Sequence, residues 1–166
     1  NNAWLLNIRG ADTKYSPIPH SYGLIDRMKK MLFFCDLSKV PMVLREKLSG
    51  IKFVNINFVK KNLASISKKK IILDGTTCSI DLENLIRKNN KIIDFYDPIY
   101  NLKSIKTKKE IKNTQKAHIY DGIALTKYLF WLKNSFKKKK ITEISASNKL
   151  YEYRKRNRKF KFPSFP

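Results

Sequence analysis

Short apolar runs alternate with amphipathic segments through about the first hundred residues, and this alternation restricts the possible folds more than any other feature. Apolar runs of strand length, separated by helical patterns and short polar loops, are typical of an α/β domain. The expected strands lie at residues 21–25, 30–35, 53–57, 71–73 and 91–95, and the expected helices at 40–48, 59–66 and 79–86.

The connections between these segments predict a mixed sheet. Residues 26–29 form a polar connection of hairpin length, so the first two strands are expected to pair antiparallel. The later strands are separated by helices, which favours parallel pairing. Before them, the apolar run Trp4–Ile8 is expected as a further strand, ended by a turn at Arg9–Asp12 and followed by a proline-held loop from Tyr15 to His20.

The alternation ends near residue 97. Asp97-Pro98 is expected to break the chain, because proline fixes its own backbone and disfavours helix in the residue before it. We expect a connector at residues 99–106 and place a domain boundary near Asn101.

A long helix is expected after this connector, from about Lys108 to Ser135. Apolar residues recur at helical spacing from His118 to Phe136, and further apolar positions widen the stripe. Its start is marked by Thr107 and Glu110, which have the spacing of a capping box. Such a wide stripe predicts a deeply packed helix with cover on more than one side.

The charge of the chain leaves two interpretations open. A net charge of +23 with a pI near 10.1 points to polyanions such as RNA, DNA or an anionic membrane. However, lysines are spread over nearly every expected element, as on an ordinary solvated surface. A second helix is expected from Thr142 to about Arg158, and the overlapping run Arg154–Phe162 combines cations with rings, which suits stacking on single strands. It equally suits a helix end followed by a strand bound to the core.

The sequence contains no recognisable catalytic constellation. The two histidines, His20 and His118, are far apart, so each is expected to be packed or hydrogen-bonded rather than a metal ligand. The carboxylates are scattered, and no nucleotide-binding or hydrolase motif occurs. Cys35 and Cys78 lack a CxxC pattern and are expected to be reduced, buried thiols of an intracellular protein.

Neither a membrane span nor a signal region is expected. No uncharged apolar run reaches the roughly eighteen residues that a membrane span needs. The residues from Asn1 to Trp4 include neither a start methionine nor a basic signal region, so the chain is expected to be the interior of something longer.

Several stretches nevertheless resemble, in order, the three-domain Xaa-Pro aminopeptidases, also called aminopeptidase P. The most specific is AWLLNIRGADTKYSPIPHSYGLI, which resembles the start of the second domain of those enzymes, although Ala11 stands where serine is commoner. The others resemble the entry to the catalytic domain of that family. They are Tyr100–Glu110, KAHIYDGIAL (Lys116–Leu125), Trp131-Leu132, ITEISASNKLYEYR (Ile141–Arg154) and FPSFP (Phe162–Pro166), the last resembling a strand.

The resemblance implies that residues 1–101 form a creatinase-type α/β domain. Residues 102–166 would then begin the α+β pita-bread catalytic domain. That family removes the first residue from peptides with proline second, using two divalent metal ions, manganese or zinc. The ligands of those ions follow the FPSFP-type segment, so the resemblance places no catalytic or metal-binding residue in this chain and predicts that the segment alone is inactive.

The resemblance also implies partners and an environment. A cytoplasmic enzyme is expected, forming a homodimer through the catalytic domain, with no membrane partner and with nucleic acid disfavoured as a partner. The apolar surface of Lys116–Lys133 would be covered by a domain mostly absent from this chain, so part of it is expected to be exposed. His118 is expected to be a packing residue.

Arg9 is the one candidate substrate-binding residue. It could line the approach to the catalytic cleft as a cationic or hydrogen-bonding group. Alternatively, Arg9 pairs with Asp12 or another nearby acid and holds the turn, which we consider the simpler expectation from the sequence.

Overall fold

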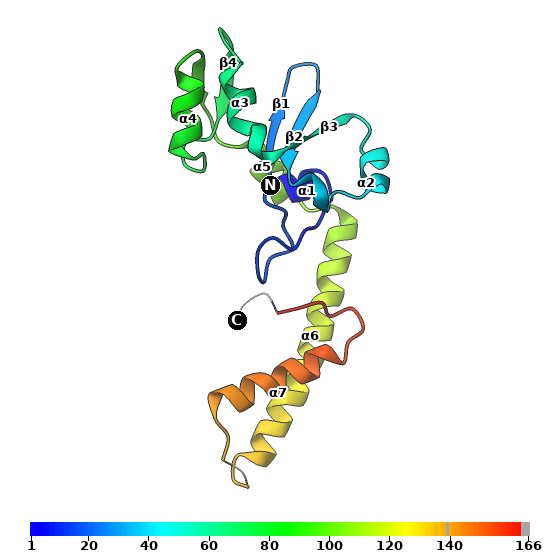
Figure 1. The fold of residues 1–166 in the computed structure, drawn as a ribbon. Helices are drawn as coiled ribbons and strands as arrows, with labels where there is room; N and C mark the ends of the chain where they lie inside the picture. The colour runs from blue at the N-terminus through cyan, green and yellow to red at the C-terminus, as the bar shows by residue number, and fades with distance from the viewer. Residues whose placement is uncertain (139, 164–166) are drawn as a thin grey trace. The chain divides into compact units, whose positions relative to one another are not determined.

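The computed structural model describes residues 1–138 and 140–163, and its chain divides into two compact units, Asn1–Ser104 and Ile105–Pro166 (Figure 1). The first contains all the strands named below, and the second contains two helices. None of the helices described is long and apolar enough to cross a bilayer.

The first unit contains a three-stranded mixed sheet. The strands β1 (Tyr22–Ile25) and β2 (Met31–Cys35) pair antiparallel, and β3 (Ile51–Asn55) pairs parallel with β2. The hairpin turn depends on Asp26, whose side-chain oxygen accepts hydrogen bonds from the backbone N–H groups of Met28 and Lys30. The predicted hairpin and the mixed sheet are therefore confirmed.

A second, two-stranded sheet consists of β4 (Lys70–Leu73) and β5 (Lys91–Asp94), which pair parallel as predicted. Helices follow the strands, as the alternation indicated. The helices and 3-10 turns that connect the strands are η1 (Leu37–Lys39), α2 (Met42–Lys47), η2 (Ile56–Phe58), α3 (Val59–Ala64) and α4 (Ile80–Arg87). The strand predicted at residues 53–57 begins and ends two residues earlier, because Asn55 caps η2 with its side chain.

Strand β2 lies at the centre of the hydrophobic core because successive side chains on a strand point to opposite faces. Phe34 packs with Val59, Leu63, Leu82 and Ile86, the buried residues of α3 and α4. On the other face of β2, Phe33 lies in a cluster with Ile8, Met31 and Cys35. Strand β2 thus joins two cores.

Two predictions in this unit are wrong. Trp4–Ile8 is not a strand, because residues Asn2–Leu5 form the short helix α1, in which Trp4 and Leu5 donate to the carbonyl of Asn1. A short apolar run carries no reliable period, so it cannot distinguish the two states. The chain turns out of the helix at Asn7, which has a positive φ of 50°.

The expected connector at residues 99–106 is also mostly helical, since α5 spans Pro98–Ser104. The side chain of Asp97 accepts a hydrogen bond from the N–H of Ile99, and the carbonyl of Asp97 accepts one from Tyr100. Asp97 therefore caps the helix and Pro98 occupies its first position, where a missing N–H costs nothing. The Asp-Pro pair begins a helix here instead of breaking one.

In the second unit, α6 spans Lys108–Ser135 with the predicted bounds. The Thr107 hydroxyl accepts from the N–H of Glu110, while the Glu110 carboxylate accepts from the N–H of Thr107, which confirms the capping box. The second helix, α7, spans Glu143–Lys155 and is capped by Thr142, as predicted, although it ends before Arg158.

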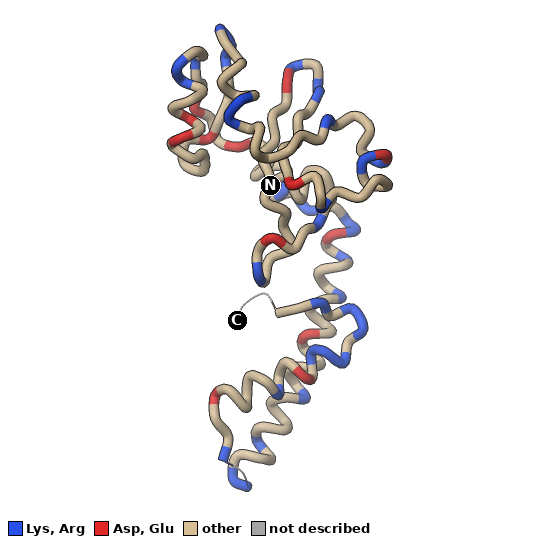
Figure 2. Tube along the Cα trace, in the orientation of Figure 1, with Lys and Arg blue, Asp and Glu red and all other residues tan. Residues whose placement is uncertain are grey.

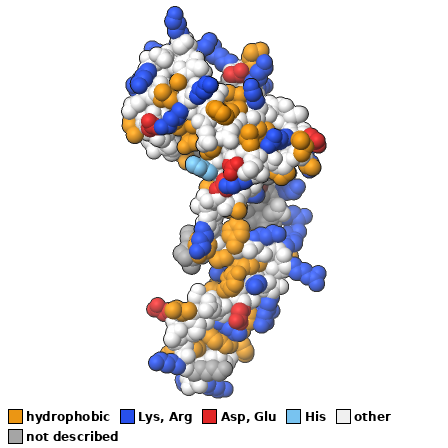
Figure 3. Space-filling model, in the orientation of Figure 1, with side chains coloured by type: hydrophobic (Ala, Val, Ile, Leu, Met, Phe, Trp, Pro, Cys, Tyr) orange, Lys and Arg blue, Asp and Glu red, His pale blue; other side chains and the backbone are white. Residues whose placement is uncertain are grey.

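The prediction of deep packing for α6 is wrong. Ala124 is the single buried residue of this helix, all of which the structure describes. Leu129 is 53% exposed and Phe130 is 73% exposed, and hydrophobic side chains reach the surface over this unit (Figure 3). His118, expected in the packed stripe, is exposed as well. The exposure expected from the family resemblance is therefore confirmed.

An ion pair connects the two helices of this unit. Arg154 of α7 donates two hydrogen bonds to the carboxylate of Asp121 on α6, at 2.6 and 3.1 Å, which tie the two helices together. The strand expected at Phe162–Pro166 falls largely on residues 164–166, which lie outside the described residues.

Candidate functional site

The loop that follows α1 folds back on itself at Gly10. The Gly10 N–H donates to the carbonyl of Pro17 at 3.3 Å, and a Cβ at Gly10 would lie 2.8 Å from the Cα and the N of Pro19. Only glycine allows two backbone segments to approach so closely. This contact places residues from both ends of the loop side by side.

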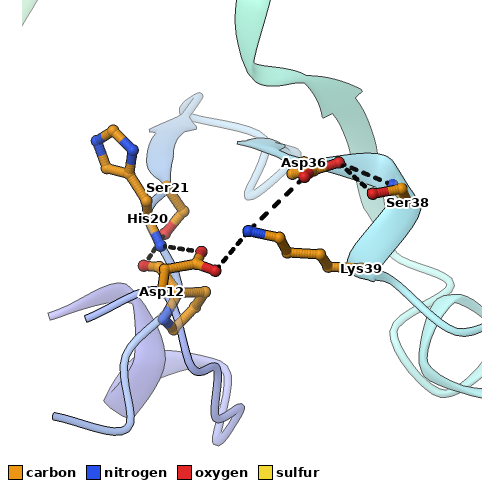
Figure 4. A network of polar contacts seen from close by, with 7 residues as sticks. Asp12, His20, Ser21, Asp36, Ser38 and Lys39 are labelled. Carbon is orange, nitrogen blue, oxygen red and sulfur yellow. Dashed lines mark hydrogen bonds and ion pairs between the residues drawn. The ribbon is translucent and has the colours of Figure 1, made fainter. Parts of the chain in front are cut away.

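Beside this contact, three charged side chains form a cluster that we call the Asp12–Lys39 clasp (Figure 4). The Asp12 carboxylate accepts a hydrogen bond from the backbone N–H of His20 at 2.8 Å and pairs with the Lys39 ammonium at 2.6 Å. The carboxylate of Asp36 lies 3.7 Å from the same ammonium. Asp36 also accepts from the N–H and the hydroxyl of Ser38, and thereby caps η1.

These contacts shift the ionisation of the clasp. The Lys39 ammonium and then the His20 N–H hold the pKa of Asp12 below its ordinary value of 3.8. The Ser38 hydroxyl and N–H lower the pKa of Asp36 in the same way. The Asp12 carboxylate in turn raises the pKa of Lys39 above 10.5. All three groups are consequently charged near neutral pH.

Two hollows lie on either side of the clasp. The larger, of about 760 Å³, includes Asn1, Asn2, His20 and Ser21 in its lining. The smaller, of about 360 Å³, has apolar walls that include Ile8, Phe33, Val40, Leu44 and Phe53. Four residues line both hollows, namely Asp12, Pro19, Asp36 and Lys39. The clasp thus contributes to the lining of both hollows.

Arg9 lines the smaller hollow but does not pair with Asp12, which corrects the simpler expectation. Its guanidinium donates to the backbone carbonyl of Ile8 at 2.8 Å and more weakly to that of Ala3 at 3.4 Å. In the part of the chain that the structure describes, Arg9 forms no ion pair. Arg9 therefore fastens the loop to α1, and its role in binding substrate stays a prediction.

The remaining candidate residues do not join a catalytic group. The ring of His20 packs against Tyr22, with centroids 5.8 Å apart. Cys35 and Cys78 are both free, as predicted, but Cys78 is only half-buried. Burial raises the pKa of both thiols. Within residues 1–138 and 140–163, no three His, Cys, Asp or Glu side chains gather to hold a metal ion.

The arrangement is suited to recognition rather than catalysis. It offers fixed charges of both signs beside an apolar recess, without a nucleophile held against a base. Sequence reasoning did not identify Lys39, because its partner Asp12 is 27 residues away.

The clasp predicts a pH dependence of stability. Asp12 has a lowered pKa when folded, so its contribution is present above pH 3.8 and is lost as the pH falls through the folded pKa. Lys39 has a raised pKa, so its contribution is present below pH 10.5 and is lost at still higher pH. We expect Asp12→Asn to lower the unfolding temperature at neutral pH, with the difference from wild type shrinking below pH 3.8. Thermal unfolding of both proteins at several pH values measures this difference.

A matched control is Asp81→Asn, which removes the partner of Lys60 from an ion pair of 2.7 Å. Both side chains of that pair are about two-thirds exposed, whereas the Asp12 side chain is only 17% exposed. Solvent-exposed pairs contribute little, so Asp81→Asn should change the unfolding temperature less. Equal effects of the two substitutions would contradict a structural role for the clasp.

The fold and this loop match a known class of domain. Residues 1–110 match the family model described as the creatinase/prolidase N-terminal domain. The chain belongs to this family. The matched residues include the whole α/β unit, Asn1–Ser104.

Individual relatives extend the similarity through the second unit. The chain is 30% identical to "Probable Xaa-Pro aminopeptidase P" of Pyrenophora teres f. teres (strain 0-1), over 98% of this chain and 27% of that protein. It is also 30% identical to the protein of the same name from Coccidioides posadasii (strain RMSCC 757 / Silveira), over 98% of this chain and 28% of that protein. The chain therefore spans less than a third of the length of these relatives.

A solved structure supports the fold. A Xaa-Pro dipeptidase from Bacillus anthracis superposes with a TM-score of 0.63 and is 22% identical in sequence. The match covers 93% of this chain and 41% of that chain. The fold is thus that of a creatinase-type domain followed by the helices that come next in a pita-bread relative.

Proposed function

We propose that this chain is part of a metal-dependent Xaa-Pro aminopeptidase, which releases the first residue from peptides with proline second. The observation that carries the proposal is the share of this chain over which it is similar to its relatives. Similarity to proteins named Xaa-Pro aminopeptidase P continues over 98% of the chain and therefore includes both units. Residues 1–101 would be the creatinase-type domain and residues 102–166 the beginning of the catalytic domain.

The metal chemistry of such an enzyme is assigned outside this chain. In the family that the sequence resembles, two divalent ions, manganese or zinc, activate a water molecule and polarise the scissile carbonyl. The residues that the structure describes do not fit these ions, since no three ligands gather among them. The ligands would follow Pro166, and no catalytic step is assigned to a residue of this chain.

The first unit would form one wall of the catalytic cleft and would help to recognise the peptide. The Asp12–Lys39 clasp offers fixed charges to peptide N–H and C=O groups, and the smaller hollow could accept an apolar side chain. Arg9 lies at the same hollow and is the candidate substrate-binding residue. The full-length enzyme would be cytoplasmic and would dimerise through its catalytic domain.

The alternative, a basic module that binds nucleic acid or another polyanion without catalysis, is not favoured. The relatives that cover the whole chain are named as peptidases. Net charge alone describes a surface and specifies no fold.

The test uses the full-length protein that contains this chain. Incubation with an X-Pro-Pro peptide and manganese should release the first residue, measured by mass spectrometry of the products. A peptide with alanine second is the matched control and should be cleaved much more slowly. Absence of cleavage with manganese or zinc present would refute the proposal, as would activity of residues 1–166 alone.

A further inference from the structure

A group of cations surrounds a hollow at one end of the two-stranded sheet. The hollow, which we call the basic hollow, has a volume of about 520 Å³. It is formed where the chain enters β4 and where α4 ends and β5 begins. Its lining consists of Lys68, Lys69, Lys70, Arg87, Lys88, Asn89, Asn90 and Lys91. Blue segments mark these two loops at the tips of β4 and α4 (Figure 2).

The two basic loops are held together by backbone contacts and by Asn90. The side-chain amide of Asn90 donates to the carbonyls of Ile66 and Ile86, at 2.8 and 3.1 Å, and its oxygen accepts from the N–H of Lys69. The N–H of Lys68 donates to the carbonyl of Asn89 at 2.8 Å. This network fixes the spacing of the backbones of the two loops, so the cations of both loops stay near one hollow.

The cations in the hollow are largely without acidic partners. Arg87 pairs with Glu83, one turn earlier on α4. In the described ranges, none of the five lysines of the lining forms an ion pair with a carboxylate. Like charges held close together destabilise the folded chain, and a bound anion would relieve this repulsion.

The chemistry of the lining selects among anions. It contains no aromatic and no aliphatic side chain. Nucleic acid bases bound as single strands usually stack on aromatic rings, and membrane-binding surfaces insert apolar side chains, so neither is favoured here. Lysine ammonium groups and asparagine amides instead suit phosphate oxygens.

We propose that the basic hollow binds a small anion that carries several adjacent phosphate groups, either an inorganic polyphosphate or the phosphate chain of a nucleotide. A single phosphate engages only part of the lining, whereas a chain of phosphates reaches both loops. The site lies within the first unit and is separate from the Asp12–Lys39 clasp. It does not depend on the peptidase activity.

The experiment is calorimetric titration of the full chain with inorganic tripolyphosphate at two salt concentrations. The key variant replaces Lys68, Lys69 and Lys91 by glutamine. We expect about tenfold weaker binding or more in this variant, and binding by wild type that weakens as salt rises. Orthophosphate should bind more weakly than tripolyphosphate.

The matched control replaces Lys137, Lys138 and Lys140, which are exposed residues of the second unit, by glutamine. It removes the same charge, so binding within about twofold of wild type supports a local site. Equal loss in both variants would overturn the proposal, because the effect would then follow net charge alone. Thermal unfolding without ligand confirms that both variants are folded.

Three further ligands distinguish a phosphate chain from a nucleic acid and from a membrane surface. A nucleoside triphosphate that binds as tightly as tripolyphosphate, and no more tightly, supports recognition of the phosphate chain. An RNA oligonucleotide that binds more tightly than either and loses the same affinity in the key variant would overturn the proposal in favour of a nucleic-acid surface. Vesicles with phosphoinositide headgroups that outcompete tripolyphosphate would overturn it in favour of a membrane surface.

Discussion

Replacement of Phe34 by alanine is expected to lower the free energy of unfolding of the first unit by about 3–5 kcal/mol. Phe34 is 1% exposed and packs against buried side chains of α3 and α4, and strands β4 and β5 pack against the same cluster through Ile71 and Ile92. Truncation to alanine removes the largest side chain of this buried cluster and leaves a cavity beside α3 and α4. Since small domains are stable by about 5–15 kcal/mol, this loss would be a large share of the unit's stability.

The measurement must separate the two units, because a chain of two units need not unfold in one step. The chain has one tryptophan in each unit, Trp4 and Trp131, so Trp131→Phe leaves Trp4 as a reporter of the first unit. Urea unfolding followed by Trp4 fluorescence gives the free energy. The matched control is Phe95→Ala, at a side chain that is 59% exposed, which should cost less than about 1 kcal/mol. Similar losses for both substitutions would show that Phe34 does not anchor the core.

Replacement of Gly10 by alanine is expected to cost about 1–3 kcal/mol and to disturb the candidate site. The new Cβ would lie 2.8 Å from the backbone of Pro19, so one of the two segments must move. The N–H of His20, the next residue, donates to Asp12, and this bond would be strained by the movement. We therefore expect the pH dependence assigned to the Asp12–Lys39 clasp to weaken in Gly10→Ala. Urea unfolding measures the cost, and unfolding temperatures above and below pH 3.8 measure the second effect.

Gly50→Ala provides the matched control for this prediction. A Cβ at Gly50 meets no atom within 4 Å, and Gly50 has no positive φ. Alanine there restricts the unfolded chain without straining the folded one, so stability should be unchanged or rise by up to about 1 kcal/mol. If Gly10→Ala were equally harmless, the close approach of the loop to Pro19 would not be needed for the fold.

The features that the sequence predicted correctly are those set by neighbouring residues. The start of α6 follows from a capping box between Thr107 and Glu110, only three residues apart. The β1–β2 hairpin follows from the polar connection at residues 26–29, in which Asp26 bonds to the backbone two and four residues later. Such contacts need no tertiary structure, so local pattern is sufficient to identify them.

The predictions that were wrong concern residues whose state depends on distant partners. Residues 4–8 have the composition of a strand, but Leu5 and Leu6 pack against the Phe33 cluster from α1 and its C-cap, and Ile8 is buried in that cluster. Pro98 was expected to break the chain. Instead it begins α5, because the side chain of Asp97 accepts a hydrogen bond from the N–H of Ile99. The apolar stripe of α6 predicted depth, yet α7 covers only part of it.

The candidate site shows the same division. Gly10, Asp12 and Arg9 lie within four residues, in the stretch whose residue order most specifically resembles the family. The sequence by itself therefore determined the α/β class, the hairpin, the caps of α6 and α7 and the family resemblance. Only the tertiary structure decided that Asp12 pairs with Lys39 and that Arg9 binds backbone carbonyls. It also decided that two loops bring lysines to one hollow. The physical reason is that side chains far apart in sequence meet only when the packing around β2 and the β4–β5 sheet has placed their backbones.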